Sequence, residues 1–335
     1  MTVANSVSRR EDERVAREIL ARLRGLVEPA LDAAIARVSP ELHPALDYHF
    51  AGGGKFVRAG LTLLSASACG ADESVALDGA VAIELIHNFS LIHDDIIDRD
   101  VERRHRQSVW AEYGVGPAII AGDALSTLAM QLLLERPTPP RLAAATCLAD
   151  ATQEMIKGQS EDMAAEEKSS LSVSECLAVA DGKTAALLSC ACALGALLAD
   201  APALVVGAMS DFGRHLGLAF QAIDDVLGIW GEPQLTGKPI GNDLRRRKKT
   251  LPVSFAHARG LDVFATVDSD DDELSDEDVV RITTLLEGSG ARQETVDLGD
   301  DQLAAALGAL DRVALSDGAR GDLAAVARFV VGRDR

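Results

Sequence analysis

The sequence predicts an all-α protein. Apolar residues recur at the three- and four-residue spacing of a helix. One such run is Val15, Ile19, Leu20, Leu23 and Leu26. Strictly alternating runs of β-branched residues, which would indicate strands, do not occur. Between breaks rich in Gly and Pro, the chain consists of Ala- and Leu-rich segments of helical length. We therefore expect packed helices throughout.

Charge and composition limit the possible partners. The 335-residue chain has 33 Lys+Arg against 52 Asp+Glu and a formal net charge of −19. This acidity argues against nucleic acid or an anionic membrane as the main partner. Hydrophobic residues make up 47%, enough for a large core. We expect a single domain over residues 1–335. We expect the acidic run at about 268–278 to be a solvated loop between helices. A calcium site is the alternative, but the run lacks the glycine of an EF-hand loop.

Cysteine usage and apolar stretches indicate the compartment. Five scattered cysteines without a CxxC pair predict neither a disulfide framework nor structural zinc, and favour a reducing, cytoplasmic location. The first residues lack the apolar core of a secretory signal. The longest uncharged stretch, residues 184–199, is shorter than the ~18–20 residues of a spanning helix. We expect it to be a buried helix and expect no stable membrane insertion.

The first group of candidate site residues lies in an apolar helical segment, residues 81–98. Asp94 and Asp98 are four residues apart and share a helical face with His87, while Asp95 lies beside them. Neighbouring carboxylates repel each other. A divalent cation would remove that repulsion, and Mg²⁺ suits a few oxygen ligands completed by water and a substrate phosphate. The alternative is that these carboxylates merely face solvent at a helix end.

Paired guanidinium groups follow at Arg103 and Arg104 and favour a site for a phosphate ester. A competing interpretation is a di-iron centre, because Glu84 and His87, and again Glu102 and His105, have the ExxH spacing of such helix bundles. That centre needs the two copies on separate facing helices. The copies lie too close in sequence for that arrangement.

A second group lies further along the chain. Gln221, Asp224 and Gly228 share one helical face, and Asp225 lies beside them. Basic residues follow at Lys238 and in the segment 245–249. In so acidic a chain, we interpret this basic cluster as a phosphate clamp rather than a surface patch. The GKT tripeptide at 182–184 is not a P-loop, because no Gly-rich strand–loop–helix surrounds it.

With these motifs in this order, the chain resembles the trans-isoprenyl diphosphate synthases, or polyprenyl synthetases. The resemblance extends from the GGKFVR segment at 53–58 to the C-terminal helices. It implies an isoprenoid synthase fold, an all-α bundle around a central cavity, usually as a homodimer. It also implies transfer of an allylic group to isopentenyl diphosphate, with Mg²⁺ as cofactor and three ions present when substrate is bound.

The resemblance also assigns roles to residues. Metal binding falls to the two aspartate motifs, with Asp94 and Asp98 as main ligands and Asp224 holding a further ion; the set is Asp94, Asp95, Asp98, Asp224 and Asp225. The isopentenyl diphosphate site comprises Lys55, Arg58, His87 and Arg104. The allylic diphosphate site comprises Arg103, Gln159, Asp162, Lys183 and Lys238. Thr184 and Gln221 lie beside the developing cation, and Lys248 lies on a closing loop.

One departure from the family pattern concerns the second motif, where Gly228 stands in place of the third aspartate. This departure keeps a class I terpene cyclase open as an alternative, although a cyclase has no use for an isopentenyl site. A non-catalytic subunit is a third possibility, but it would be expected to have lost metal aspartates.

Two residues one helical turn before Asp94 bear on product length. An aromatic residue at Phe89 with a small one at Ser90 resembles geranylgeranyl diphosphate synthases. We predict a twenty-carbon product, with fifteen carbons as the alternative.

Overall fold

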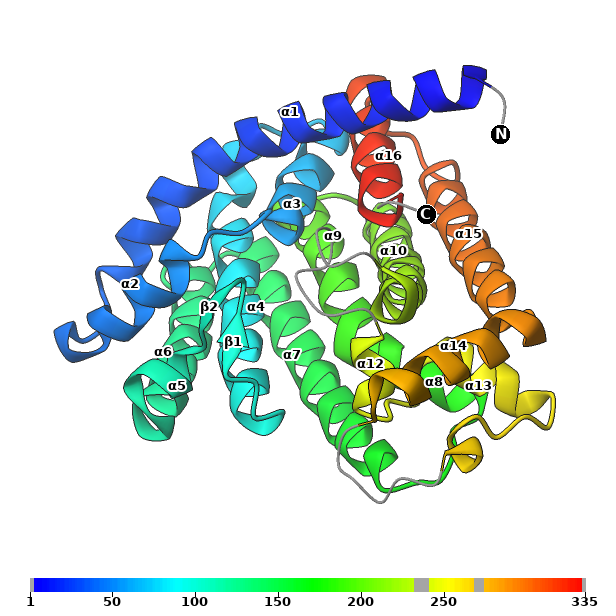
Figure 1. The fold of residues 1–335 in the computed structure, drawn as a ribbon. Coiled ribbons are helices and arrows are strands. Elements are labelled where there is room, and N and C mark those ends of the chain that lie inside the picture. Colours follow the sequence, from blue (N-terminus) through cyan, green and yellow to red (C-terminus); the bar gives the residue numbers. More distant parts are fainter. Residues whose placement is uncertain (1–2, 232–240, 268–273, 333–335) are drawn as a thin grey trace. The chain divides into compact units, whose positions relative to one another are not determined.

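The computed structural model describes residues 3–231, 241–267 and 274–332, with side chains from residue 12 onward. Within these ranges the chain is helical almost throughout (Figure 1), which confirms the all-α class. It divides into two compact units. The first comprises Met1–Thr152, Leu187–Gly213 and Ala309–Phe329, and the second comprises Gln153–Ala186, Arg214–Gly308 and Val330–Arg335. The single-domain organisation stays a prediction.

The first unit contains the helices of the N-terminal part of the chain and some helices from later segments. Its elements are α1 (Val3–Ile35), η1 (Pro40–Leu42), α2 (His43–Ala51), α3 (Val57–Ala68), η2 (Glu73–Ala76), α4 (Leu77–Ile97), β1 (Glu102–Arg103), β2 (Arg106–Gln107), α5 (Val109–Tyr113), α6 (Val115–Leu134) and most of α9 (Ala186–Leu198) and α16 (Asp317–Val331). Two long helices have residues in both units, namely α7 (Pro139–Glu166) and α10 (Ala203–Trp230).

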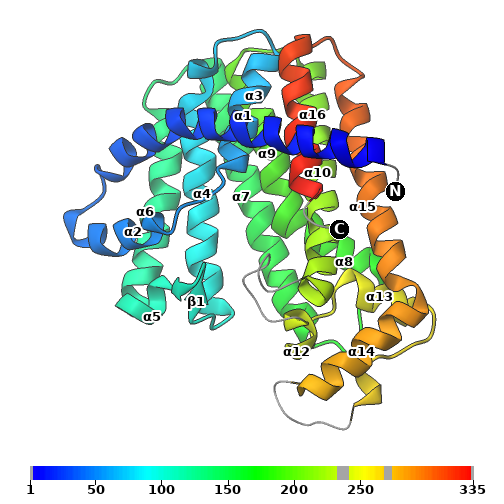
Figure 2. The ribbon, with the colours of Figure 1, turned by 45° about the horizontal axis from the view of Figure 1, so that its top comes forward.

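Helix α4 is the central element of the first unit. It packs against α3 and α6, and Figure 2 shows α4 and α6 side by side. Its residues 79–86 are all buried, so this part of the helix is surrounded rather than amphipathic. Helix α1 lies across α3 and α4. Leu20 and Leu23 of α1 are buried as its periodicity predicts, whereas Leu26 is 45% exposed.

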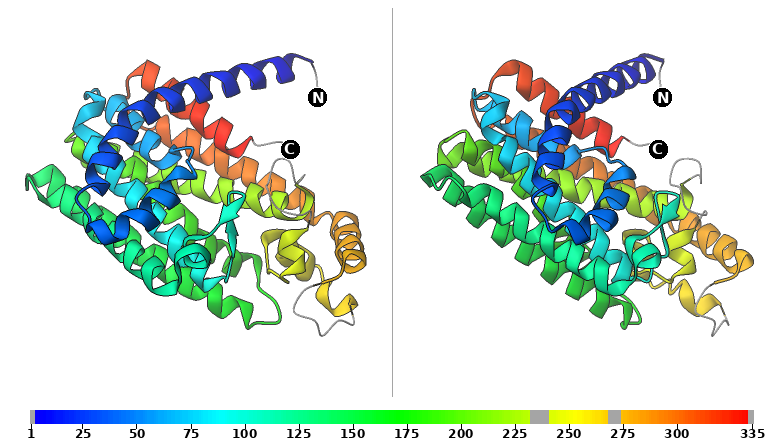
Figure 3. Two further views of the ribbon diagram at one scale, coloured as in Figure 1. Left: turned by 60° about the vertical axis from the view of Figure 1, so that its left-hand side comes forward. Right: turned by 90° about the vertical axis from the view of Figure 1, so that its left-hand side faces the viewer.

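A short β-hairpin after α4 was not anticipated from the sequence. Strands β1 and β2 pair antiparallel, with two residues each, and appear as the small arrows in Figure 3. Arg104 and His105 form the turn with φ of 53° and 61°. Positive φ at both central residues is the geometry of a type I′ hairpin turn, which Asn-Gly usually supplies. The residues Arg104 and His105 therefore do not indicate a hairpin turn at the level of sequence.

The second unit consists of shorter helices. Its own elements are α8 (Val173–Ala180), the π-helical turn η3 (Asp181–Ala185), α12 (Asn242–Arg245), α13 (Leu251–Ala258), η4 (Phe264–Thr266), α14 (Asp276–Ser289) and most of α15 (Ala291–Leu310). Helix α13 packs against both α8 and α14. Buried apolar residues at these contacts include Val253, Ala256, Ile282 and Leu286.

The acidic run proved to be only partly a loop where it can be described. Residues 268–273 lie outside the described residues. Asp276, Glu277 and Asp278 form the first turn of α14, and the Ser275 side chain accepts a hydrogen bond from the Asp278 N–H. The loop expectation is corrected for these three residues. Carboxylates stabilise a helix N-terminus because they face the positive end of its dipole.

Three helical segments are long and apolar enough, by length and composition alone, to span a membrane. They are Glu73–Ile97, Val115–Leu134 and Val173–Leu198. These segments contain charged residues, so a search for uncharged stretches does not find them. Their most apolar windows are 61%, 44% and 56% buried inside the protein. Much of their apolar surface is thus already covered by neighbouring helices.

The five cysteines are free thiols. Cys176, Cys190 and Cys192 are buried. Burial raises the pKa of Cys176 and of Cys192 to about 12. Such thiols stay protonated near neutral pH and are therefore unreactive as nucleophiles or metal ligands.

Close backbone packing inside the first unit depends on Gly195 of α9. A Cβ at this position would lie 2.1 Å from the backbone oxygen of Thr62 on α3. The Thr62 hydroxyl also donates a 2.8 Å hydrogen bond to the Ala191 carbonyl. These contacts leave no room for a side chain at residue 195.

We predict that Gly195→Ala lowers the free energy of unfolding by about 2 kcal/mol or more, because overpacking forces α3 and α9 apart. Gly25→Ala is the matched control. No atom lies within 4 Å of a Cβ there, and alanine should stabilise α1 by about 0.5–1 kcal/mol. Denaturant unfolding measures both. Equal stabilities for the two variants would contradict the packing argument.

Candidate active site

Two predicted metal ligands lie in the last turn of α4. Asp98 is the C-cap residue, and its N–H donates a 2.8 Å hydrogen bond to the Asp94 carbonyl. Both aspartates are half-buried. The C-terminal end of a helix carries partial negative charge, so carboxylates here are electrostatically unfavourable without a cation. The helix end is thus suited to attract one.

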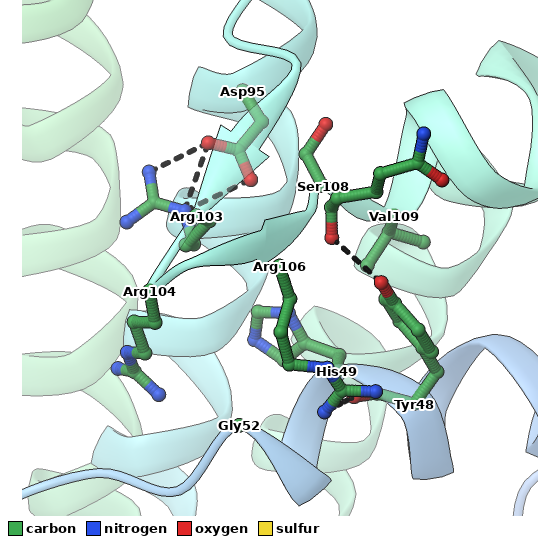
Figure 4. A pocket seen from close by; sticks show the side chains of 10 residues that line it. Tyr48, His49, Gly52, Asp95, Arg103, Arg104, Arg106, Ser108 and Val109 are labelled. Carbon is green, nitrogen blue, oxygen red and sulfur yellow. Dashed lines mark hydrogen bonds and ion pairs between the residues drawn. The ribbon is translucent and has the colours of Figure 1, made fainter.

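Asp95 has a different environment from its neighbour. Its carboxylate is 1% exposed and accepts hydrogen bonds from Arg103, with Nε at 2.8 and 2.9 Å and Nη2 at 2.7 Å (Figure 4). Burial raises the pKa of Asp95, and the Arg103 charge opposes that rise. Asp95 was predicted as a metal ligand. The structure instead engages both of its oxygens with the guanidinium of the following hairpin.

The hairpin places Arg104 at an exposed position next to Arg103. Its left-handed backbone is unfavourable for a residue with a Cβ, and such strain often marks functional sites. Because Asp95 fixes the start of the hairpin through Arg103, it also fixes where Arg104 projects. The predicted pair of phosphate-binding arginines is therefore present at one turn.

A small pocket opens beside these arginines. Figure 4 shows residues of α2 and of the hairpin around it; its lining is Tyr48, His49, Gly52, Asp95, Arg103, Arg104, Arg106, Gln107, Ser108 and Val109. The guanidinium of Arg106 lies 4.2 Å from the centre of the Tyr48 ring. Three arginines against one aspartate make the pocket suited to anions. Sequence reasoning missed Arg106, Tyr48 and His49, which belong to no motif.

Residues predicted for isopentenyl diphosphate come together in the first unit. Arg58 Nη1 lies 3.3 Å from His87 Nε2, so Arg58 donates to a neutral imidazole. Burial and the Arg58 charge lower the pKa of His87 well below its usual value. Arg58 is the second residue of α3, and the exposed Lys55 lies two residues before this helix begins. The two cations therefore flank the start of one helix.

A buried polar network lies under this group. His49 Nε2 donates to Asn88 Oδ1 at 2.8 Å, and Asn88 Nδ2 donates to the Glu84 carbonyl at 2.8 Å. Burial lowers the pKa of His49 to about 4, and burial raises the pKa of Glu84. The network holds α2 to α4 one turn from His87. The sequence singled out Glu84 only through its spacing to His87.

The geometry rules out the di-iron interpretation. Glu84 and His87 lie on α4, but Glu102 lies in β1 and His105 in the turn that follows. The second ExxH copy is therefore not helical, whereas the di-iron arrangement requires both on facing helices.

In the second unit, two glycines let α7 contact the π-helical turn. A Cβ at Gly158 would lie 2.4 Å from the Lys183 nitrogen, and one at Gly182 would lie 2.9 Å from the Gly158 Cα. The GKT tripeptide forms this turn, which continues from α8 into α9 rather than following a strand. Turns of this kind often occur at functional sites. The contact brings Lys183 to the predicted allylic residues of α7.

These side chains form two connected groups. Lys183 Nζ lies 2.7 Å from Asp162 Oδ2. The Thr184 hydroxyl donates to Gln221 Oε1 at 2.8 Å, and Gln221 Nε2 donates to Asp225 Oδ1 at 2.8 Å. The structure thus joins predicted residues of η3 with those of α10. The buried Oε1 of Gln159 has no hydrogen-bond partner within the described ranges.

Asp225 was predicted as a metal ligand and also lies inward. Its Oδ1 accepts the Gln221 bond, and its Oδ2 accepts the Leu251 N–H at 2.9 Å. Burial raises its pKa to about 7, and the hydrogen bonds oppose that rise. Asp224, by contrast, is exposed. Asp225 fixes the start of α13 to α10, and its two oxygens are used in doing so.

The structure describes only one of the two lysines predicted to bind a diphosphate in the basic segment. Lys238 lies outside the described residues. Lys248 follows α12, and its N–H donates a 2.9 Å hydrogen bond to the Asp243 carbonyl. Whether either lysine grips a diphosphate stays a prediction.

The predicted length-determining residues lie on α4. The Phe89 ring packs edge-on against His93, with centres 4.8 Å apart. His93 Nε2 donates to the Ile119 carbonyl at 3.0 Å. A Cβ at Gly122 would lie 2.3 Å from that nitrogen. Gly122 therefore makes room for the imidazole that supports Phe89.

The Asp94 and Asp98 carboxylates fit Mg²⁺ if a phosphate ester supplies further oxygen ligands. In the described parts of the chain, no three His, Cys, Asp or Glu side chains gather so that they could hold a metal alone. Mg²⁺ commonly uses one or two carboxylates and completes its shell with water and substrate phosphate. Asp94 and Asp98 supply such a pair at a helix end. These residues suit Mg²⁺ that arrives with a phosphate ester.

Comparisons with known proteins agree with this class of site. The polyprenyl synthetase family model matches residues 39–270. The (2E,6E)-farnesyl diphosphate synthase of Mycobacterium tuberculosis is 39% identical over 92% of this chain and 90% of its own length. The geranylgeranyl diphosphate synthase of the same organism is 37% identical over 94% and 93%.

Solved structures show the same relationship. The polyprenyl synthetase from Streptomyces coelicolor A3(2) has a TM-score of 0.89 and 42% identity, covering 94% of this chain and 99% of that one. Geranylgeranyl pyrophosphate synthase from Corynebacterium glutamicum, complexed with isoprenyl diphosphate and magnesium, has a TM-score of 0.80 and 27% identity, covering 96% and 99%.

The fold and these matches define a helical isoprenoid synthase. The chain belongs to the polyprenyl synthetase family, the trans-isoprenyl diphosphate synthases. It is a trans-prenyltransferase, and the family relationship supports a divalent metal and isoprenyl diphosphate substrates.

We predict that His49 makes the protein sensitive to acid. Its folded pKa of about 4 lies below the ordinary value of 6.5. Between these values the unfolded chain binds a proton that the folded chain excludes, so lowering the pH costs up to about 1.4 kcal/mol per unit. His49→Gln keeps a donor for Asn88 but does not titrate. Its unfolding free energy should fall less between about pH 6.5 and about pH 4.5. Parallel profiles would contradict a buried, neutral His49.

Proposed function

We propose that the protein condenses isopentenyl diphosphate with an allylic diphosphate to give an all-trans product, geranylgeranyl diphosphate. The observation behind this proposal is the Asp94–Asp98 pair at the end of α4, followed at once by the hairpin that presents Arg103 and Arg104. A pyrophosphate ester suits both the aspartates and the arginines. A metal ion held by the aspartates would bind its oxygens, and the guanidinium groups would bind its phosphates.

We assign metal binding to Asp94, Asp98 and Asp224, which lie at half-buried or exposed positions. When bound, Mg²⁺ neutralises the diphosphate and makes it a better leaving group; we expect three ions. Asp95 and Asp225 become positioning residues instead. The Asp95 carboxylate forms an ion pair with Arg103, and the Asp225 carboxylate accepts a hydrogen bond from the Leu251 N–H. Each therefore holds a neighbouring segment in place.

The basic residues would bind the two diphosphates. Arg58 and His87 lie together, and with Lys55 and Arg104 they form the proposed isopentenyl diphosphate site. Arg103 bonds Asp95 through Nε and Nη2. Its Nη1 is not used in that pair and can serve the allylic diphosphate. Lys183, Lys238 and Lys248, with Gln159 and Asp162, complete the proposed allylic site.

The allylic carbon–oxygen bond breaks first in this mechanism and leaves an allylic cation. The lone pairs of the Thr184 hydroxyl and the carbonyl of Lys183 are dipoles that would stabilise it. Gln221 holds Thr184 in place. The isopentenyl double bond then attacks the cation, a new carbon–carbon bond forms, and the released diphosphate takes the proton. The protein needs no base of its own, but it must exclude water from the cation.

Product length is the finer part of the proposal. Phe89, fixed by His93, and the small Ser90 support a twenty-carbon product. Fifteen carbons are the second candidate, favoured by the 39% identity to a farnesyl diphosphate synthase. Family membership and the grouped isopentenyl residues argue against a terpene cyclase.

A homodimer is also proposed. Helix α6 leaves large apolar residues exposed on one face: Val115, Ile119, Ile120 and Leu134. Exposed apolar surface of this kind marks association sites. We expect sedimentation velocity to give twice the monomer mass, and Ile120→Glu to shift the protein toward monomer. A wild-type monomer at micromolar concentration would contradict the proposal.

The direct test of function is an incubation of purified protein with Mg²⁺, isopentenyl diphosphate and farnesyl diphosphate. We expect geranylgeranyl diphosphate as the main product, detected by mass spectrometry. Ser90→Phe should shorten the product, because a large ring one turn before Asp94 blocks the growing chain. A product of unchanged length in this variant would contradict the assignment of Ser90. Cyclic hydrocarbon from the allylic diphosphate alone would contradict the proposed reaction.

A further inference from the structure

We propose that Cys147 of α7 and Cys190 of α9 form a modification site, a pair of thiols that a peroxide oxidises to a disulfide and that a small thiol reduces again. The inference goes beyond the proposed function and does not depend on it. No step of the proposed reaction uses a cysteine, and neither residue belongs to the proposed metal or diphosphate sites.

The two sulfur atoms lie in contact within the first unit. Cys147 Sγ is 3.7 Å from Cys190 Sγ, a distance at which two thiols share a weak hydrogen bond. Both residues belong to the parts of α7 and α9 that lie in this unit. A disulfide bond is about 2.05 Å long, so the sulfurs need to approach by about 1.7 Å more. Rotations about the two Cα–Cβ bonds can move the sulfur atoms by that amount.

Small residues around the pair let the two helices approach closely. Ala144 and Ala151 lie one turn before and one turn after Cys147 on the same face of α7, and both are buried. Ala193 lies one turn after Cys190 on α9 and is also buried. A disulfide needs its two Cα atoms within about 7 Å of each other, which bulky side chains between the helices would prevent. The alanines leave that approach open.

The two thiols differ in access and in acidity. Cys147 is half-buried, whereas Cys190 is 3% exposed. The hydrogen bond from Cys190 lowers the pKa of Cys147, although burial opposes that shift. Burial raises the pKa of Cys190 well above its usual value. Because the thiolate is the nucleophile, a small oxidant in solution reacts with Cys147, and Cys190 then closes the disulfide.

Hydrogen peroxide is the oxidant for this reaction. The Cys147 thiolate attacks one peroxide oxygen, the O–O bond breaks, and the hydroxide that leaves takes up a proton to become water. Cys147 is then a sulfenic acid. The Cys190 sulfur attacks the Cys147 sulfur, so an S–S bond forms while the S–O bond breaks, and the Cys190 proton leaves with the departing oxygen as water. The two thiols thus lose two electrons and two protons, and one peroxide becomes two waters.

The site is suited to reversible oxidation. The sequence predicts a reducing location, where the two thiols stay reduced until an oxidant is present. A small thiol such as dithiothreitol can reach the half-buried Cys147 and reduce the disulfide again. The bond would join residues 43 positions apart and tie α7 to α9. We therefore expect the oxidised protein to resist unfolding better than the reduced protein.

Mass spectrometry of the full-length protein after hydrogen peroxide treatment tests the site. We expect a loss of about 2 Da that dithiothreitol reverses, and a cross-linked peptide pair that contains Cys147 and Cys190. Cys147→Ser and Cys190→Ser should each abolish the loss. Cys69→Ser is the matched control, because Cys69 is the other half-buried thiol, and it should leave the loss unchanged.

Two further measurements test the order of the steps and their effect. In Cys190→Ser, peroxide should leave Cys147 as a sulfenic acid that dimedone labels. In Cys147→Ser, the buried Cys190 should be labelled at least about tenfold more slowly. Oxidised wild-type protein should melt about 5 °C higher than reduced protein, and neither serine variant should show that shift.

The wild-type result decides the main point without any variant, because peptide mapping locates the bond. Peroxide-treated wild-type protein without a bond between Cys147 and Cys190, or with a bond between other cysteines, would overturn the proposal. Faster labelling of Cys190 than of Cys147 would overturn the assignment of the attacked thiol. An unchanged melting temperature in the oxidised form would overturn the stabilising effect. None of these results would affect the proposed function.

Discussion

A buried carboxylate must be met by hydrogen bonds, and this constraint organises both aspartate motifs. Asp95 lies within the first unit, where the Arg103 guanidinium satisfies its two oxygens. Asp225 lies within the second, where Gln221 and the Leu251 N–H do the same. An unpaired charge at either place would destabilise the fold by several kcal/mol, about 3–5. These two residues therefore serve the structure before they serve chemistry.

The same constraint underlies our proposal of which aspartates bind a metal. On a helix, adjacent residues point about 100° apart, so when one member of an Asp-Asp pair faces inward, the other faces a more open side. Asp94 and Asp224 are those other members, half-buried and exposed respectively. The inward aspartates also tie down the segments that follow, the hairpin of Arg104 and the start of α13. In our proposal, each Asp-Asp motif therefore combines one metal ligand with one residue that holds the following segment in place.

Much of this could be predicted from the sequence, because helix periodicity and motif order are local properties. The all-α class is confirmed. Thr184 and Gln221 form a hydrogen bond, and their role beside a cation stays a prediction. Contacts between distant segments could not be predicted. The His49–Asn88 bond and the contact between Cys147 and Cys190 join residues that share no motif. The hairpin could not be predicted, because its turn contains Arg104 and His105 where glycine or asparagine would be expected.

The central claim is the division of labour between neighbouring aspartates, and anomalous scattering tests it most directly. Crystals of the protein would be soaked with Mn²⁺ and inorganic pyrophosphate, and the metal located from its anomalous signal. We expect Mn²⁺ about 2.1 Å from oxygens of Asp94 and Asp98, with Asp95 still paired to Arg103. Mn²⁺ bound by Asp95, with Arg103 released from that carboxylate, would contradict the account.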